Sequence, residues 1–282
     1  MIENRPWLTF ISHSVLILGV IAVALPIWVA VVASTHPADA FGQGSIPLWF
    51  GNYATETWQT VLFSAAGNGV DVPVWKMMFN SLVMALGIAF GKIVISLISA
   101  YAIVFFRFPL RSFCFWLIFM TLMLPVEVRI LPTYEVVAKL NLLNSYTGLA
   151  LPLIASATAT FLFRQAFMAM PGELVEAARM DGAGPIRFFF DILLPLTRTN
   201  IAALFVILFI YGWNQYLWPL LITTDDAYYT LVMSIKRMVS VADGAIEWNS
   251  IMATTILAML PPVAVVIGMQ KMFVKGLVDS EK

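Results

Sequence analysis

The sequence predicts an all-α integral membrane protein with six transmembrane helices. Hydrophobic residues make up 61% of the 282 residues and charged residues 11%, whereas soluble domains average about 45–50% and about 25%. The mean hydropathy is +0.88, and the apolar residues gather in runs close to the roughly 20 residues that a spanning helix needs. The predicted spans are 11–33, 77–106, 112–131, 146–163, 201–222 and 251–269.

Charge and residue counts argue against several classes of function. The formal net charge is zero, which argues against a nucleic-acid partner, because binding to phosphate backbones needs an excess of Lys and Arg. Cys114 is the only cysteine, so no intrachain disulfide can form. His13 and His36 have no Cys, His or carboxylate at ligand spacing. We therefore expect no metal site and no cofactor in this chain.

The N-terminal apolar run allows two interpretations. A cleaved signal peptide is one, because Ala38, Asp39 and Ala40 resemble a small-x-small cleavage site. The apolar region of a signal peptide is about 7–15 residues long, and the run 11–33 is longer, which favours an uncleaved first span. The polar interval 35–76 is too irregular to cross a bilayer. We expect a loop or short helices there, outside the membrane.

Small residues in the second span predict close helix packing. Gly87 and Gly91 are four residues apart, and so are Ser96 and Ala100. Such spacing leaves a groove into which the backbone of another helix fits, so we expect this span to be buried among other helices. The third span carries Pro125 near its far end.

Basic residues set the expected orientation. Six spans place both termini on one side, and ten of the sixteen Lys and Arg residues fall on that side. They are Arg5, Arg107, Arg111, Arg164, Arg179, Arg187, Arg198, Lys271, Lys275 and Lys282. Because short cytoplasmic segments carry the excess of Lys and Arg, we expect both termini and the loop 171–195 to be cytoplasmic.

The loop 171–195 is the longest segment that combines charge, Gly and Pro. Glu173 and Glu176 favour the positive N-terminal end of a helix over 173–181, and Gly182 suits the left-handed position that ends such a helix. Pro185 fits the first turn of a second helix. That second helix presents an apolar stripe, predicted to pack on the protein's own membrane helices: Ile186, Phe189, Phe190, Leu193 and Leu194.

The first helix of the loop lacks a large apolar face. Ala177 and Ala178 are expected to be exposed, so that a groove in another protein closes onto the backbone while Glu176 and Arg179 make charged contacts. An amphipathic helix on the membrane surface is the alternative. Such helices are usually rich in Lys and Arg on the polar face, whereas acidic and basic residues balance here. We predict that 171–195 is a docking segment.

At these residues the chain resembles a known family. The pattern E-A-A at 176–178, followed by Gly182 and then by Ile192, Leu194 and Pro195, is similar to the EAA loop of ABC importer permeases. Other marks similar to the carbohydrate-uptake branch are Asn80-Ser81, Tyr101-Ala102, Pro125 and Trp213-Asn214. The resemblance covers the whole chain and implies the type I ABC importer permease fold, multi-pass in a bacterial inner membrane.

The resemblance also implies partners and roles. A second permease completes a heterodimer, an ATPase subunit dimer binds ATP and Mg, and a periplasmic substrate-binding protein delivers the substrate, all in contact with membrane lipid. The residues expected to couple to the ATPases are Glu173, Glu176, Ala177, Ala178, Arg179, Asp181 and Gly182. Residues 1–76 would form the first span and a periplasmic loop, 77–270 the permease core, and 271–282 a cytoplasmic tail. The chain itself is not expected to be an enzyme.

Two cationic residues are candidates for the substrate path. Lys92 lies near the middle of the second span, where an ionisable side chain is costly and by default suggests function. Arg129 lies near the outer end of the third span. Positive charge along the path would suit a phosphorylated substrate. The alternatives are a structural contact for Lys92 and a local pair with Glu127 for Arg129.

Polar groups in the fifth span form a second candidate set. Asn214 and Gln215 offer hydrogen-bonding groups at a depth where they must be satisfied, either lining the path or joining helices. Tyr216 and Trp218 are expected in the belt of aromatic residues at the membrane interface.

Longer segments narrow the implied substrate. FRFPLR at 106–111, LMLPVEVRI at 122–130 and YGWNQYLWPLL at 211–221 resemble importers of sn-glycerol 3-phosphate and glycerophosphodiesters. A permease for a neutral sugar or oligosaccharide is the alternative, which Lys92 and Arg129 disfavour. An ion-coupled secondary transporter should carry acidic residues in its spans, whereas Asp and Glu here fall almost wholly in loops.

Overall fold

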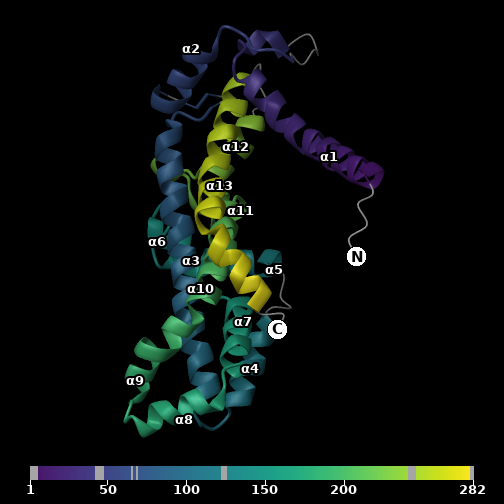
Figure 1. Ribbon diagram of the computed structural model, residues 1–282. Helices are drawn as coiled ribbons and strands as arrows, with labels where there is room; N and C mark the ends of the chain where they lie inside the picture. The colour runs from purple at the N-terminus through teal and green to yellow at the C-terminus, as the bar shows by residue number, and fades with distance from the viewer. Residues whose placement is uncertain are drawn as a thin grey trace. The chain divides into compact units, whose positions relative to one another are not determined.

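The structure is a computed structural model that describes residues 6–41, 48–64, 66–67, 69–121, 126–240 and 246–279 (Figure 1). Within these ranges every regular element is a helix, and Gly67 and Val70 form an isolated bridge. The chain divides into two compact units. The first comprises Met1–Lys76 and Ser234–Leu260, and the second comprises Met77–Met233 and Pro261–Lys282.

Four described helices are long and apolar enough to cross a membrane: Trp7–Ala33, Val74–Phe105, Pro185–Trp213 and Trp248–Gln270. A fifth span arises if Tyr146–Leu153 and Ala157–Met168, bent by 51°, count as one. The predicted third span, 112–131, is not among them. Its described parts are α4 (Arg111–Met120) and the start of α5 (Val126–Lys139). Pro125 lies outside the described residues.

The first unit contains the N-terminal helix and the irregular interval after it. Its helix α1 (Pro6–Ala33) is apolar and exposed along most of its length, which suits contact with lipid or another subunit better than contact with water. Short helices follow, as the sequence predicts. They are η1 (Ala38–Phe41), α2 (Ala54–Gln59) and η2 (Thr60–Ser64). The Asn249 amide, from α13 (Trp248–Asp279), donates to Thr57 Oγ1 in α2 at 3.2 Å.

The second unit is built on α3 (Val74–Phe105), whose middle packs against short helices from later in the chain. These are α6 (Tyr146–Ala150), η4 (Leu151–Leu153) and α11 (Leu217–Ile222). The shared core consists of Met84, Ile88, Val137, Leu149, Leu153, Trp218 and Ile222. The Trp218 indole N–H donates to the Gly148 carbonyl at 3.1 Å. Trp218 is therefore a core residue, and its predicted place in an interfacial belt is wrong.

A buried polar pair at the start of α3 fixes a distant loop. Asn80 Nδ2 donates to the carbonyls of Ala227 and Tyr229, both at 2.9 Å, and Asn80 Oδ1 accepts from the Tyr146 hydroxyl at 2.8 Å. Ser81 Oγ accepts from the backbone N–H of Leu231 at 2.8 Å. The dipeptide thus satisfies backbone groups of η6 (Asp226–Tyr228) and of the start of α12 (Leu231–Val239), which would be costly to bury unpaired.

Glycines let helices of the second unit approach closely. A Cβ on Gly87 would lie 3.1 Å from the Ala150 Cβ, and one on Gly91 would lie 2.5 Å from Ile154 Cγ2. On α10 (Leu194–Trp213), a Cβ on Gly212 would lie 2.9 Å from the Ala85 Cα. The groove predicted from the spacing of Gly87 and Gly91 is confirmed, and it is occupied by Ala150 at the end of α6 and by Ile154, the residue after η4.

We expect the substitution Gly91→Ala to destabilise the second unit. The new methyl group would also lie 2.8 Å from Ile154 Cβ, which cannot move without the backbone, and such overpacking costs about 1–3 kcal/mol. Thermal unfolding of the purified permease in detergent measures the loss. Gly19→Ala is the control, because nothing lies within 4 Å of a Cβ there. Ile154→Ala in the Gly91→Ala background removes Cγ2, the atom 2.5 Å from the new methyl group, and should recover part of the stability; no recovery would contradict a clash with Cγ2.

Candidate functional site

The segment predicted to dock forms a short helix with a defined C-terminal end. Helix α8 (Gly172–Met180) is capped by two hydrogen bonds, from Gly182 N–H to the Arg179 carbonyl at 3.1 Å and from Ala183 N–H to the Ala178 carbonyl at 2.9 Å. This is the Schellman arrangement, which needs a left-handed residue after the helix. Gly182 supplies it with φ of 72°. The predicted helix over 173–181 and the turn at Gly182 are confirmed.

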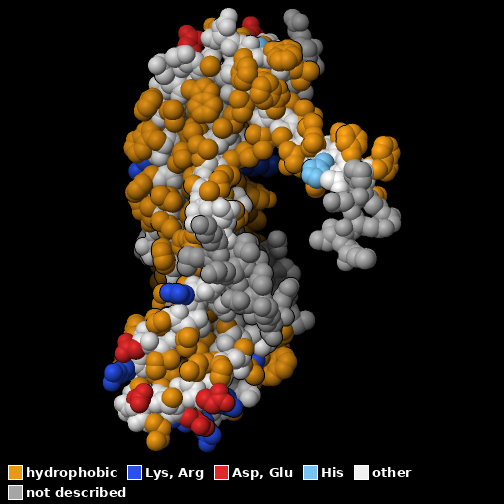
Figure 2. Space-filling model, viewed as in Figure 1, with side chains coloured by type: hydrophobic (Ala, Val, Ile, Leu, Met, Phe, Trp, Pro, Cys, Tyr) orange, Lys and Arg blue, Asp and Glu red, His pale blue; other side chains and the backbone are white. Residues whose placement is uncertain are grey.

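The two faces of α8 differ from the prediction at one alanine. Glu173, Glu176, Ala177 and Arg179 are exposed, as are Asp181 and Gly182 after them. Ala178 is only 4% exposed, so its predicted exposure is wrong. Ala178 instead faces the interior of the unit, where it lines a cavity together with Tyr101, Phe105 and Phe188. Figure 2 shows acidic and basic side chains gathered at this end of the second unit.

A cavity of about 250 Å³ separates α8 from the end of α3, and Ala178, Arg179 and Ala183 line one side of it. Tyr101 lies on the other side, and its hydroxyl donates to the Pro185 carbonyl at 2.8 Å. The Tyr101 ring also packs on Phe189, with centroids 5.0 Å apart. Tyr101 therefore ties the loop directly to the membrane helix α3, in line with its place among the family marks.

The second helix of the loop corrects the predicted apolar stripe. Residues 185–213 form one continuous helix. It begins with α9 (Pro185–Arg187), passes through a π-helical turn, η5 (Phe188–Leu193), and continues as α10. Ile186 and Phe190 are 76% and 59% exposed, whereas Phe188 and Leu193 are buried. The π-turn adds one residue per turn, so positions five apart share a face. The fifth span therefore starts earlier than residue 201, and α10 ends at Trp213.

Lys92 lies inside the second unit beside an aromatic ring. Its side chain is only 7% exposed, and its Nζ is 3.7 Å from the centroid of the Tyr211 ring. Gln215, one turn further along, donates from Nε2 to the Tyr211 carbonyl at 3.2 Å. The ring offers the ammonium group a cation–π contact, which is worth about 2 kcal/mol when desolvated. Two of the predicted path residues thus converge on Tyr211.

Arg129 belongs to the same cluster. It extends from α5, is exposed, and is close enough for its charge to act on both Lys92 and Tyr211. Arg129 also lines a mostly apolar cavity of about 390 Å³ beside Thr133. The side chain of Glu127, its predicted alternative partner, lies outside the described residues. Asn214 is the C-terminal cap of α10, and its side chain is exposed.

Tyr211 is the functional candidate that sequence reasoning missed. It sits in the quoted segment 211–221, four residues before Gln215, and positions four apart share a helix face. That spacing could have placed it beside the predicted path. Among the described residues, no group of three or more His, Cys, Asp or Glu could hold a metal ion.

The comparisons place the chain in a transport family. Residues 92–279 match the model of binding-protein-dependent transport system inner membrane components. The chain belongs to this family, and it is an inner-membrane component of a binding-protein-dependent transport system.

Relatives along the full length carry a more specific name. The sn-glycerol-3-phosphate transport system permease protein UgpE of Escherichia coli O157:H7 is 57% identical over 282 residues, which is 100% of both chains. The same values hold for the proteins of that name from Shigella dysenteriae serotype 1 (strain Sd197) and Escherichia coli (strain K12).

A solved structure shows the fold. A chain of a bacterial ABC transporter involved in the import of the acidic polysaccharide alginate aligns with a TM-score of 0.78 and 18% identity. The alignment covers 96% of this chain and 98% of that chain. The fold is that of an ABC importer permease.

Proposed function

We propose that this chain is one permease subunit of an ATP-driven importer that moves sn-glycerol 3-phosphate, and glycerophosphodiesters, across the inner membrane by alternating access. The observation that carries the proposal is the 57% identity over the whole of both chains to permeases named for that substrate. The chain has no role in hydrolysing ATP, which belongs to the ATPase subunits.

The proposed topology has six spans with both termini in the cytoplasm. The four long helices and the bent pair account for five, and α4 with α5 would contribute to the sixth. Residues 1–76 then hold the first span and a periplasmic loop, 77–270 the core, and 271–282 a cytoplasmic tail. In the complex, a different permease pairs with this chain and two ATPase subunits dock below. The exposed apolar surface of α1 suits lipid or that second permease.

The docking role is assigned to α8 and the turn after it. Glu173, Glu176, Ala177 and Asp181 are exposed, and so is Arg179, which also lines the cavity toward α3; together they offer charges of both signs to an ATPase groove. Ala178 instead lies on the side of α8 toward α3, and its carbonyl accepts the Ala183 N–H that closes the turn at Gly182.

Force on α8 would reach the membrane through two links. One is the hydrogen bond from Tyr101 to Pro185, and the other is the continuous helix 185–213, which carries any movement of the loop into the span. ATP-driven closure of the ATPase dimer would push α8 as a rigid body and open the path outward. The loop biases the two states only through contacts that differ between them.

The path proposed for the phosphate group is the cluster of Lys92, Arg129, Tyr211 and Gln215. A phosphate monoester carries up to two negative charges, and hydrogen bonds between charged groups are roughly twice as strong as those between neutral groups. Tyr211 holds the Lys92 ammonium group by its ring, which leaves the N–H donors that point away from the ring for a passing anion. Asn214 would add an exposed amide one residue before Gln215.

The test is stimulation of ATP hydrolysis in the reconstituted complex. The two permeases and the ATPase subunits are placed in liposomes, and binding protein is added either empty, or loaded with glycerol 3-phosphate, or with a neutral disaccharide. We expect ATP hydrolysis to rise only with binding protein that is loaded with glycerol 3-phosphate. Stimulation by the neutral disaccharide alone would overturn the substrate assignment, and stimulation by neither would overturn the assignment to a binding-protein-dependent importer of these substrates.

A further inference from the structure

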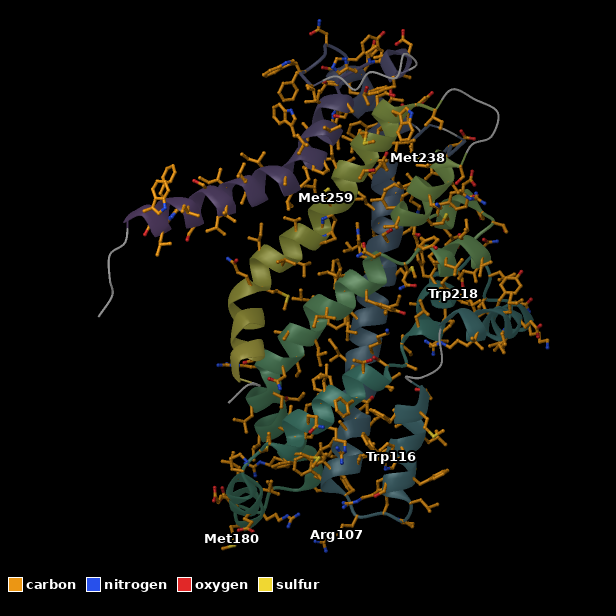
Figure 3. All side chains as sticks on the ribbon, turned by 90° about the vertical axis from the view of Figure 1, so that its right-hand side faces the viewer. Arg107, Trp116, Met180, Trp218, Met238 and Met259 are labelled. Atoms are coloured by element: carbon orange, nitrogen blue, oxygen red, sulfur yellow. The ribbon has the colours of Figure 1, made fainter. Side chains whose placement is uncertain are left out.

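A basic cavity lies outside the docking helix α8 and outside the cluster around Lys92. It lies in the second unit between the start of α4, the end of α3 and α7 (Ala157–Met168). Its volume is about 400 Å³. Arg111, Ser112 and Arg164 supply its polar lining, and Phe115 and Trp116 lie among its apolar residues. Figure 3 shows Trp116 further along this unit from the end that carries Arg107 and Met180.

Arg164 is held in place by an aromatic ring while one of its buried donors lacks an acceptor among the described residues. Its guanidinium carbon lies 4.2 Å from the centroid of the Phe115 ring, a cation–π contact that fixes the plane of the group. Its Nε is buried and has no hydrogen-bond partner among the residues that the structure describes. Within the described part of the chain, no carboxylate forms an ion pair with Arg164 or Arg111. A buried guanidinium donor without an acceptor is costly, and an anion in the cavity would remove that cost.

The first turn of α4 adds donors at the same place. Leu110 precedes this helix with φ of 64°, and no side chain caps it. The Cys114 N–H is paired with the Leu110 carbonyl at 2.9 Å, whereas the N–H groups of the first residues of a helix have no partner within it. A helix start also favours negative charge, so it reinforces the two arginines.

The surface next to the cavity is apolar. Phe113, Trp116, Leu117 and Met120 on α4 are all exposed large hydrophobic residues. In a membrane protein this surface suits hydrocarbon. The cavity therefore joins a site for an anionic group to a surface for apolar chains, which together match an amphipathic ligand better than a soluble ion.

We propose that this cavity binds the phosphate of an anionic phospholipid headgroup, with Arg111 and Arg164 contacting the phosphate oxygens and the acyl chains lying along α4. Basic pockets between membrane helices are known binding sites for such headgroups. The lipid comes from the cytoplasmic leaflet, and this one point rests on the orientation given in the proposed function. The binding itself depends on neither the substrate nor the coupling role.

The experiment measures lipid retained by the assembled complex. The complex of both permeases and the ATPase subunits is delipidated, phosphatidylglycerol or phosphatidylcholine is titrated in, and bound lipid is counted by native mass spectrometry. Arg164→Gln should weaken phosphatidylglycerol binding about tenfold or more, because a hydrogen bond to a charged group is lost. Arg111→Gln should weaken phosphatidylglycerol binding as well. Because Arg111 is exposed, this variant still tests the proposal if the complex with Arg164→Gln fails to assemble. Phosphatidylcholine should bind weakly to every form.

Arg107→Gln is the matched control. It removes the same charge from the connection just before α4, and Arg107 does not line the cavity, so binding should match the unsubstituted complex. Equal loss in Arg107→Gln would overturn the proposal in favour of a general charge effect, and unchanged binding in Arg111→Gln and Arg164→Gln would overturn it directly. A separate titration with inorganic phosphate distinguishes the source. If inorganic phosphate binds in a way that depends on Arg164 and phosphatidylglycerol is not retained, the ligand is a soluble anion and the assignment to a lipid is wrong.

Discussion

Replacing Gly182 with valine is expected to reduce transport about tenfold while ATP hydrolysis continues. Gly182 has φ of 72° and closes the hydrogen bonds that end α8. A left-handed conformation costs a residue with a Cβ roughly 1–2 kcal/mol, and a β-branched side chain increases the cost. The cap would open and α8 would no longer move as a rigid body with α9. Uptake of labelled glycerol 3-phosphate per ATP hydrolysed, in proteoliposomes, measures the coupling.

Gly184→Val is the control for this variant. Neither glycine has an atom within 4 Å of a Cβ position, so neither substitution creates a clash. Gly184, however, is extended, with φ of −68° and ψ of 168°, and valine adopts this conformation readily. Transport should therefore stay near normal in Gly184→Val. Equal uptake per ATP in both variants would contradict the assignment of coupling to the turn at Gly182.

Lys92→Gln is expected to slow uptake of glycerol 3-phosphate by roughly tenfold to a hundredfold, because a hydrogen bond between charged groups contributes about 1.5–3 kcal/mol. The measurement uses saturating loaded binding protein, so that affinity in that protein does not limit the rate. Tyr211→Phe keeps the ring beneath Lys92 and should retain most of the rate, whereas Tyr211→Leu removes the ring and should lower it.

Lys139→Gln is the control for charge alone. Lys139 is an exposed residue in the last turn of α5, so its loss changes the net charge by the same amount without touching the cluster. Normal uptake in this variant, with slow uptake in Lys92→Gln, would support a phosphate path at Lys92. Normal uptake in Lys92→Gln would remove Lys92 from the path.

Long apolar runs and small-residue spacing could be predicted from the sequence, because each is a local property of the chain. The helices over 11–33 and 77–106 follow from composition, and the groove at Gly87 and Gly91 follows from residue size. The docking helix and its end at Gly182 also follow from local rules, since dipole and cap preferences act within one turn.

Other features depend on contacts between distant segments and were not accessible in this way. Trp218 was assigned to the interface, but the Gly148 carbonyl, 70 residues away, offers it a partner inside the core. Ala178 is predicted to be exposed, but it is buried on the side of α8 that shares a cavity with Tyr101, Phe105 and Phe188. The spacing to Gln215 could have pointed to Tyr211, but the contact of its ring with Lys92 joins two helices and depends on the fold.

The π-turn at η5 has a consequence for how sequences of this kind are compared. Each residue of an α-helix advances by about 100° around the axis, so one extra residue between Arg187 and Leu194 offsets the phase of the docking end against the span by about that angle. The number of residues between Gly182 and Thr197, which is buried in α10, is therefore fixed by angular phase as well as by length. Hydropathy averaged over a window of about 19 residues does not register such an offset. A chain with one residue fewer in this interval would keep the same apolar profile. Its α8 would nevertheless face a different side of the permease.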